Sequence, residues 1–110
     1  MAIFKSVPVK KYIGENLVET SSCVVVENTT YNTSGEDALI VRGVDNCVVY
    51  LNSNTTDHIT IKAMTDVLII SDKEIDEEYL EIELQKGASI ELRFLKNFWY
   101  IMSSDGLKNS

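Results

Sequence analysis

The chain has 110 residues, of which 45% are hydrophobic and 25% are charged, and its formal net charge is −7. This size and composition are typical of one globular domain. Because 17 acidic residues outnumber 10 basic ones, clustered phosphate contacts are disfavoured and we expect no nucleic-acid partner. No apolar run approaches the ~20 residues of a membrane helix, and the first residues lack a secretory apolar stretch, so we expect a cytoplasmic product without a membrane partner.

Residues 1–20 differ from the rest of the chain. They contain the only proline, Pro8, a basic pair at Lys10 and Lys11, and no regular alternation of apolar and polar residues. We therefore divide the chain into an extended N-terminal arm, 1–20, and a single β domain, 21–110. A free arm of this kind is normally disordered, so we expect it to become ordered on a partner.

Short apolar segments follow the arm at intervals of about ten residues, as expected for an all-β protein. Most of them alternate with period 2, which places one face of each strand in a core. The sequence predicts an antiparallel meander or β-sandwich of about eight short strands and no helix. The expected strands are 23–27, 38–42, 47–52, 58–63, 67–71, 79–84, 89–94 and 98–103.

Hairpin loops between these strands predict which side chains lie opposite one another. A two-residue loop at 96–97 pairs Phe94 with Trp99 and Arg93 with Tyr100, and its Asn tolerates the positive φ of such a turn.

Loops at 53–57, at 64–65 and at either 85–87 or 85–89 extend the same antiparallel pairing upstream. The expected inward set is Val49, Leu51, Ile59, Ile61, Leu68, Ile70, Leu80, Ile82, Ile90, Leu92, Phe94, Trp99 and Ile101.

The opposite face of these strands is also rich in apolar residues. Either a second layer of a sandwich covers it, or it is an interface with another copy or another protein, where aromatic residues and Met are enriched. The candidate interface residues are Val48, Tyr50, Val67, Ile69, Phe98, Tyr100 and Met102.

Acidic residues are concentrated in 72–83, which holds seven of the 17 carboxylates. We interpret this segment as a solvated loop and strand face. A calcium site is the alternative, but the glycine-punctuated spacing of an EF-hand is absent, and we expect neither a metal nor a cofactor. Paired carboxylates such as Asp76 and Glu81 would also suit glycoside hydrolysis.

The remaining reactive side chains are few. The only histidine, His58, begins a strand beside Asp57, and we interpret it as part of a surface pair rather than as a general base. Cys23 and Cys47 each adjoin valines, so we expect buried free thiols. These observations predict no catalytic residues and no enzyme activity.

Residues 48–106 carry five short motifs in order. They are Ile59-Thr60-Ile61-Lys62, Val67-Leu68-Ile69-Ile70, Ile75-Asp76-Glu77, Gly87-Ala88-Ser89-Ile90-Glu91-Leu92 and Asn97-Phe98-Trp99-Tyr100-Ile101-Met102-Ser103. This order resembles the β-rich unit of bacteriophage tail-fibre and head-decoration proteins. Two positions depart from that pattern, because Glu77 replaces the usual turn glycine and Lys96 stands where Asp-Gly is common.

The resemblance implies a non-enzymatic structural component of a bacteriophage virion, in a capsid decoration, a neck or a tail fibre. Its partners would be other virion proteins and further copies of itself, a homotrimer being favoured, and it would be assembled in the host cytoplasm. The alternative is a carbohydrate-binding module that attaches to a host glycan, with Trp99, Tyr100, Tyr50 or Tyr79 stacked on sugar rings. A small hydrolase using carboxylates within 72–83 is a third hypothesis.

Overall fold

The computed structural model describes residues 22–106, and this part of the chain is all-β. The proposed arm, 1–20, lies outside the described residues. The strands are β1 (Cys23–Val26), β2 (Thr30–Asn32), β3 (Ala38–Val41), β4 (Cys47–Leu51), β5 (His58–Ala63), β6 (Val67–Ile75), β7 (Tyr79–Leu84), β8 (Ser89–Leu95) and β9 (Phe98–Asp105). Eight of them match predicted segments, whereas β2 was not predicted.

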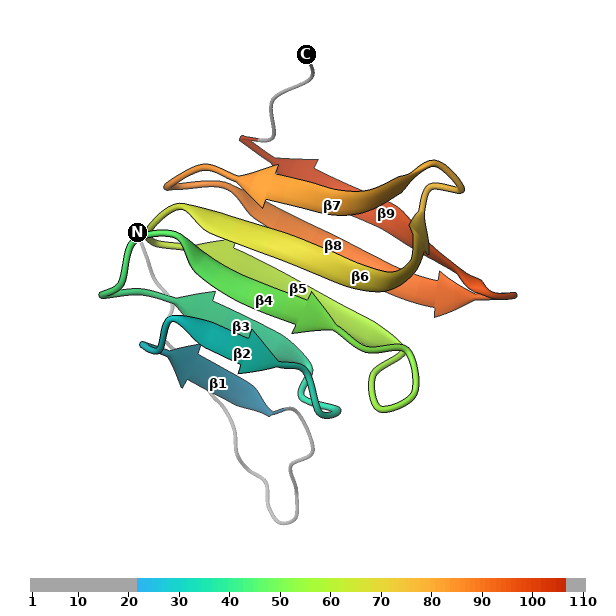
Figure 1. Cartoon of the computed structure of the whole chain (residues 1–110), viewed down its shortest axis with the longest axis horizontal. Helices are drawn as coiled ribbons and strands as arrows, with labels where there is room; N and C mark the ends of the chain where they lie inside the picture. Colours follow the sequence, from blue (N-terminus) through green and yellow to red (C-terminus); the bar gives the residue numbers. More distant parts are fainter. Residues whose placement is uncertain (1–21, 107–110) are drawn as a thin grey trace, which may run out of the picture.

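The first six strands alternate between two walls. β1, β3 and β5 pair in parallel, and so do β2, β4 and β6. Figure 1 shows the second set stacked in one layer with the first set behind it. The chain therefore winds as the coils of a β-solenoid, and the predicted antiparallel meander or sandwich is wrong for this half of the fold, although the all-β class is confirmed.

The last three strands close one end of the solenoid with antiparallel pairs. β7 pairs with β6, β8 pairs with β5, and β9 pairs with β8. A single parallel bridge between Ile75 and Trp99 also joins β9 to β6. We call β2, β4, β6 and β7 the β4 wall, and β1, β3, β5, β8 and β9 the β5 wall. At the other end, β1 and β2 are the edge strands of the described sheet.

The core lies between the two walls and is built from alternate residues of each strand. In the β4 wall, Val49 pairs with Ile69, and both side chains are fully buried. Seven predicted core residues are confirmed by their burial: Val49, Leu51, Ile59, Ile61, Ile90, Leu92 and Trp99.

The inward and outward faces of β6 are the reverse of the prediction. Val67 and Ile69 were expected at an interface but are 3% and 0% exposed, whereas Leu68 and Ile70 are only half-buried. The reason is the partner strand: the β6 register is set by parallel pairing with β4, not by a hairpin with β5. On the terminal strand β7, Leu80 was expected in the core and is 53% exposed.

The β8–β9 hairpin was predicted correctly. Phe94 pairs with Trp99 and Arg93 with Tyr100 across a turn formed by 96–97, in which φ is 53° at Lys96 and 74° at Asn97. Further along, the ladder contains a β-bulge between Glu91 and Leu92. The predicted hairpins at 53–57, 64–65 and 85–87 are wrong, because the strands on either side of each loop pair with other strands.

Candidate functional site

The outer surface of the β4 wall carries an ordered pattern that follows from the strand register. Two rows of outward residues cross the wall from β2 to β7. In each row the residue on β2 is polar, the residues on β4 and β6 are apolar, and the residue on β7 is an acid. The rows are Thr30, Val48, Leu68 and Glu83, and Asn32, Tyr50, Ile70 and Glu81. We call the six residues on β4, β6 and β7 the acid-bordered face: Val48, Tyr50, Leu68, Ile70, Glu81 and Glu83.

The apolar part of the acid-bordered face is incompletely covered. Tyr50 is 40% exposed, and Val48, Leu68 and Ile70 are half-buried. Contiguous apolar surface on a folded protein marks an interaction site more often than single exposed residues do. Two of the predicted interface residues, Val48 and Tyr50, therefore share a surface with Leu68 and Ile70, which had been expected in the core.

The other predicted interface residues lie elsewhere. Phe98 and Tyr100 on β9 pack edge to face with ring centroids 6.4 Å apart. The Tyr100 hydroxyl donates to Glu77 Oε2 at 2.8 Å, and this hydrogen bond, with burial and the charge of Glu77, raises the pKa of Tyr100. Met102, in the same strand, is 56% exposed. With Val67 and Ile69 in the core, the seven predicted residues do not form one surface.

The acidic segment 72–83 makes specific structural contacts. Asp76 Oδ1 accepts from the backbone N–H of Ile101 at 3.0 Å, which links the β6–β7 turn to β9. The same turn contains positive φ at Asp76 and Glu77. Within residues 22–106, no group of three or more His, Cys, Asp or Glu residues is placed to hold a metal ion. Glu81, the other carboxylate considered for glycoside hydrolysis, lies on the acid-bordered face opposite Ile70.

A second polar cluster joins the loops at one end of successive coils. Glu36 is 3% exposed, and its Oε1 accepts from the backbone N–H of Ser34 at 2.8 Å. The Gly35 N–H donates to Thr56 Oγ1 at 3.0 Å. Burial, followed by the neighbouring Glu36, raises the pKa of Tyr31. The hydrogen bond from Gly35 to Thr56 joins the loop after β2 to the loop after β4, whereas the one from Ser34 to Glu36 lies within the first of these loops.

The outer surface of the β5 wall contains a polar recess of about 310 Å³. It lies beside the β-bulge, a feature that often re-aims side chains near functional sites. Six of its seven lining residues, which come from three strands, carry a hydroxyl or carboxylate group: the lining is Thr60, Ser89, Ile90, Glu91, Ser103, Ser104 and Asp105.

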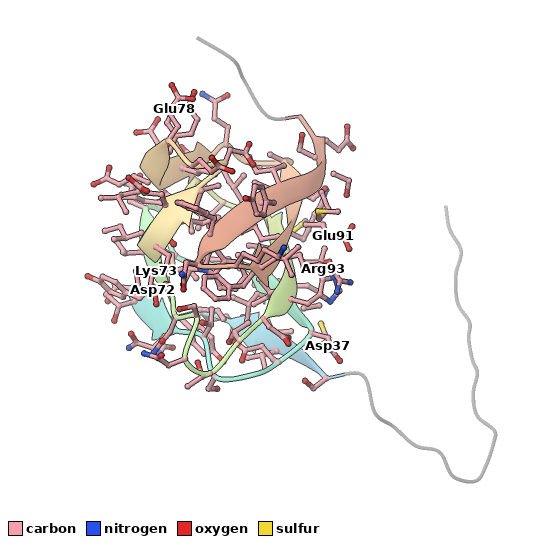
Figure 2. The ribbon with its side chains drawn as sticks, turned by 90° about the vertical axis from the view of Figure 1, so that its right-hand side faces the viewer. Asp37, Asp72, Lys73, Glu78, Glu91 and Arg93 are labelled. Atoms are coloured by element: carbon pink, nitrogen blue, oxygen red, sulfur yellow. The ribbon has the colours of Figure 1, made fainter. Side chains whose placement is uncertain are left out.

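Two side-chain hydrogen bonds hold the carboxylate of Glu91 in the recess. Its Oε2 lies 2.8 Å from His58 Nε2, and its Oε1 accepts from the Ser103 hydroxyl at 3.1 Å. Hydrogen bonds from His58 first, then from Ser103, hold the pKa of Glu91 below its usual value. Figure 2 shows Glu91 and Arg93 close together on the same flank of the molecule. His58 is thus in a surface pair, as predicted, but its partner is Glu91 rather than Asp57.

The order of these three groups does not suit nucleophilic catalysis. A serine nucleophile needs a histidine as its base, with the acid on the far side of the imidazole. Here the carboxylate stands between the serine and the histidine and accepts from both. The arrangement therefore holds Glu91 in place and supplies no activated serine.

The aromatic and thiol residues have contrasting environments. Trp99 is fully buried and cannot stack on a sugar, whereas Tyr50 and Tyr79 are 40% and 50% exposed. Both cysteines are free; Cys47 is buried as predicted, but Cys23 is exposed. The burial of Cys47 raises its pKa.

No protein-family model, curated protein or solved structure matches this chain. In the part of the chain that the structure describes, no helix is long and apolar enough to span a membrane.

Proposed function

We propose that this chain is a non-enzymatic structural component of a bacteriophage virion that assembles through the acid-bordered face. The observation that supports assembly is the pair of apolar rows on the outer surface of the β4 wall. Support for the virion assignment comes from the motif resemblance of 48–106 to phage tail-fibre and head-decoration proteins.

The strand pairing strengthens the assembly argument. Strands in parallel sheets are usually covered on both faces, and such strands are near-continuous apolar runs. The first four residues of β6, Val67 to Ile70, are such a run, and β4 contains Val48 and Val49 side by side. One face of each strand contributes to the core, so an assembled partner would supply the missing cover for the other. Removing that apolar surface from water favours association.

The test is the solution mass of the full chain, measured by light scattering for the wild type and for Tyr50→Glu. We expect a closed oligomer, a trimer by preference, for the wild type and a smaller species for Tyr50→Glu. Leu95→Glu is the matched control, because Leu95 is 56% exposed at the β8–β9 hairpin and away from the face. A monomeric wild type, or equal masses for all three proteins, would reject assembly through this face.

Carbohydrate binding at the polar recess is the second candidate function. Its support is the lining of hydroxyls and carboxylates, groups that hydrogen-bond sugar hydroxyls. In this case the sugar would be held by hydrogen bonds in the recess. It would not stack on Trp99, which is buried, or on the tyrosines expected from the sequence. A glycan-array signal that is lost in Asp105→Ala and retained in Tyr50→Glu would favour this function over assembly.

A further inference from the structure

We infer that the acid-bordered face binds the basic N-terminal segment, residues 1–11, of a second copy of this chain. The inference rests on the proposed assembly function and deepens it by naming the partner segment. It combines the surface pattern of the β4 wall with the distribution of charge along the sequence.

The acid-bordered face combines an apolar centre with negative charge along one side, which limits the kind of segment that can bind it. Its apolar centre is bordered along β7 by Glu81 and Glu83, both exposed and lying opposite Ile70 and Leu68. Within residues 22–106 neither carboxylate has a salt-bridge partner. An apolar strip with one acidic border is complementary to a segment that mixes aliphatic and basic side chains.

The sequence itself contains such a segment. Residues 1–11 hold three lysines, Lys5, Lys10 and Lys11, and no acid, in a chain whose net charge is −7. The same eleven residues include Ile3, Phe4, Val7 and Val9. They therefore combine apolar groups, which match the centre of the face, with positive charge, which matches its acidic border.

The position of β1 favours a second copy as the source of the segment. The described chain enters through Ser22, whose backbone N–H donates to Asp37 Oδ2 at 3.0 Å, and continues directly into β1. β1 belongs to the β5 wall, whereas the acid-bordered face is the outer surface of the β4 wall. A segment of the same chain would have to pass around the solenoid, but a neighbouring copy can present its segment directly.

Charge reversal in the full chain tests the inference. One variant combines Glu81→Lys with Glu83→Lys, and the other combines Lys10→Glu with Lys11→Glu. Each alone places like charges together at the proposed contact, so we expect each to have a lower solution mass than the wild type. An equimolar mixture restores opposite charges only between unlike chains, and we expect it to form a complex heavier than either variant alone.

Two further proteins define the controls. Glu27→Lys with Asp45→Lys makes the same change in net charge as Glu81→Lys with Glu83→Lys, but at exposed residues outside the face, and it should retain the wild-type mass. The variant that carries all four face and segment substitutions restores opposite charges at every contact between copies, and it should recover the wild-type mass. Circular dichroism establishes that every variant is folded.

The outcomes separate this inference from the proposed function. Wild-type mass in both charge-reversal variants, with a reduced mass for Tyr50→Glu, would overturn the inference and leave assembly through the face intact. If both charge-reversal variants lose mass and neither their mixture nor the four-substitution variant recovers it, binding by a second copy is also overturned. Recovery in the mixture, with an unchanged control, supports the inference.

Discussion

The indole Nε1 of Trp99 donates a hydrogen bond to Asp72 Oδ1 at 3.3 Å. The other oxygen of the same carboxylate accepts from the hydroxyl of Ser53 at 2.6 Å and from its backbone N–H at 3.0 Å. Trp99 lies in β9, Asp72 in β6, and Ser53 in the loop after β4. One carboxylate therefore connects the closing strand of the solenoid to a preceding coil.

Replacing Asp72 should destabilise the fold. In Asp72→Ala, the buried indole N–H and two groups of Ser53 lose their acceptor, and we expect the free energy of unfolding to fall by about 1–3 kcal/mol. Urea denaturation followed by tryptophan fluorescence measures the change. Glu74→Ala is the control, because Glu74 is an exposed acid in the same strand; equal midpoints for both variants would contradict the proposed role of Asp72.

Trp99 itself should contribute much more than Asp72. It is the largest fully buried side chain of the described residues and packs against Phe94 with ring centroids 5.3 Å apart. We expect Trp99→Ala to reduce the free energy of unfolding by about 3–5 kcal/mol, as measured by urea denaturation followed by circular dichroism. Tyr79→Ala, at a half-exposed aromatic residue, should change it far less. A near-neutral Trp99→Ala would mean that the core does not depend on this ring.

The sequence was sufficient to predict contacts that depend on a short loop. The pairing of Phe94 with Trp99 is determined by a two-residue turn, and all the residues that form this turn and this pair lie within six consecutive positions of the sequence. Likewise, alternation located eight of the nine strands. β2 was missed because its only large apolar residue, Tyr31, lies between Thr30 and Asn32, which gives almost no strand signal.

Long-range parallel pairing could not be predicted in the same way. Val67 and Leu68 are both apolar, so alternation alone allows either residue to face inward. The choice is made by pairing with β4, and the offset between partners varies: Cys23 pairs with Ala38, whereas Ala38 pairs with Thr60. A variable offset leaves no fixed repeat in the sequence.

The candidate sites were missed for the same reason. The acid-bordered face joins residues from three strands, and the recess joins His58 to Glu91 and Ser103. Each set is brought together only by the strand register. The one local signal was the outward Val48 and Tyr50, which were identified from alternation.

The β8–β9 turn offers a stabilising substitution. Lys96 and Asn97 both have positive φ, 53° and 74°, a conformation that favours Asn-Gly and is costly for lysine. We expect Lys96→Asn combined with Asn97→Gly to raise the free energy of unfolding by about 0.5–1 kcal/mol. Thermal denaturation measures the effect. The opposite change, Lys96→Val, should destabilise the hairpin, and a stabilising valine would show that the turn adopts a different backbone conformation.

The two cysteines should react at very different rates. Cys23 is exposed, whereas Cys47 is buried and its pKa is raised by burial, so less of the reactive thiolate forms there. A thiol reagent that gives a coloured product should label one residue per folded chain and two after denaturation. Cys23→Ser should abolish the fast phase, and rapid labelling that survives this substitution would contradict the burial of Cys47.

The Glu91 carboxyl should titrate below the usual range. Its pKa is lowered by hydrogen bonds from His58 and, to a smaller extent, Ser103, against an ordinary value of about 4.3. Carbon-detected NMR of the side-chain carboxyl measures it directly. We expect His58→Ala to raise the pKa toward the ordinary value and Ser103→Ala to raise it by a smaller amount.

The same depressed pKa determines how stability depends on pH. Since the folded-state pKa of Glu91 lies below its unfolded-state pKa, the stabilisation is present above the unfolded-state pKa and is lost as pH falls through the folded-state pKa. Wild type should therefore lose more stability than Glu91→Gln between about pH 6 and about pH 3. Glu74→Gln is the control, which should follow the wild type. Parallel pH profiles for wild type and Glu91→Gln would show that the hydrogen bonds in the recess do not favour the ionised carboxylate in the folded protein.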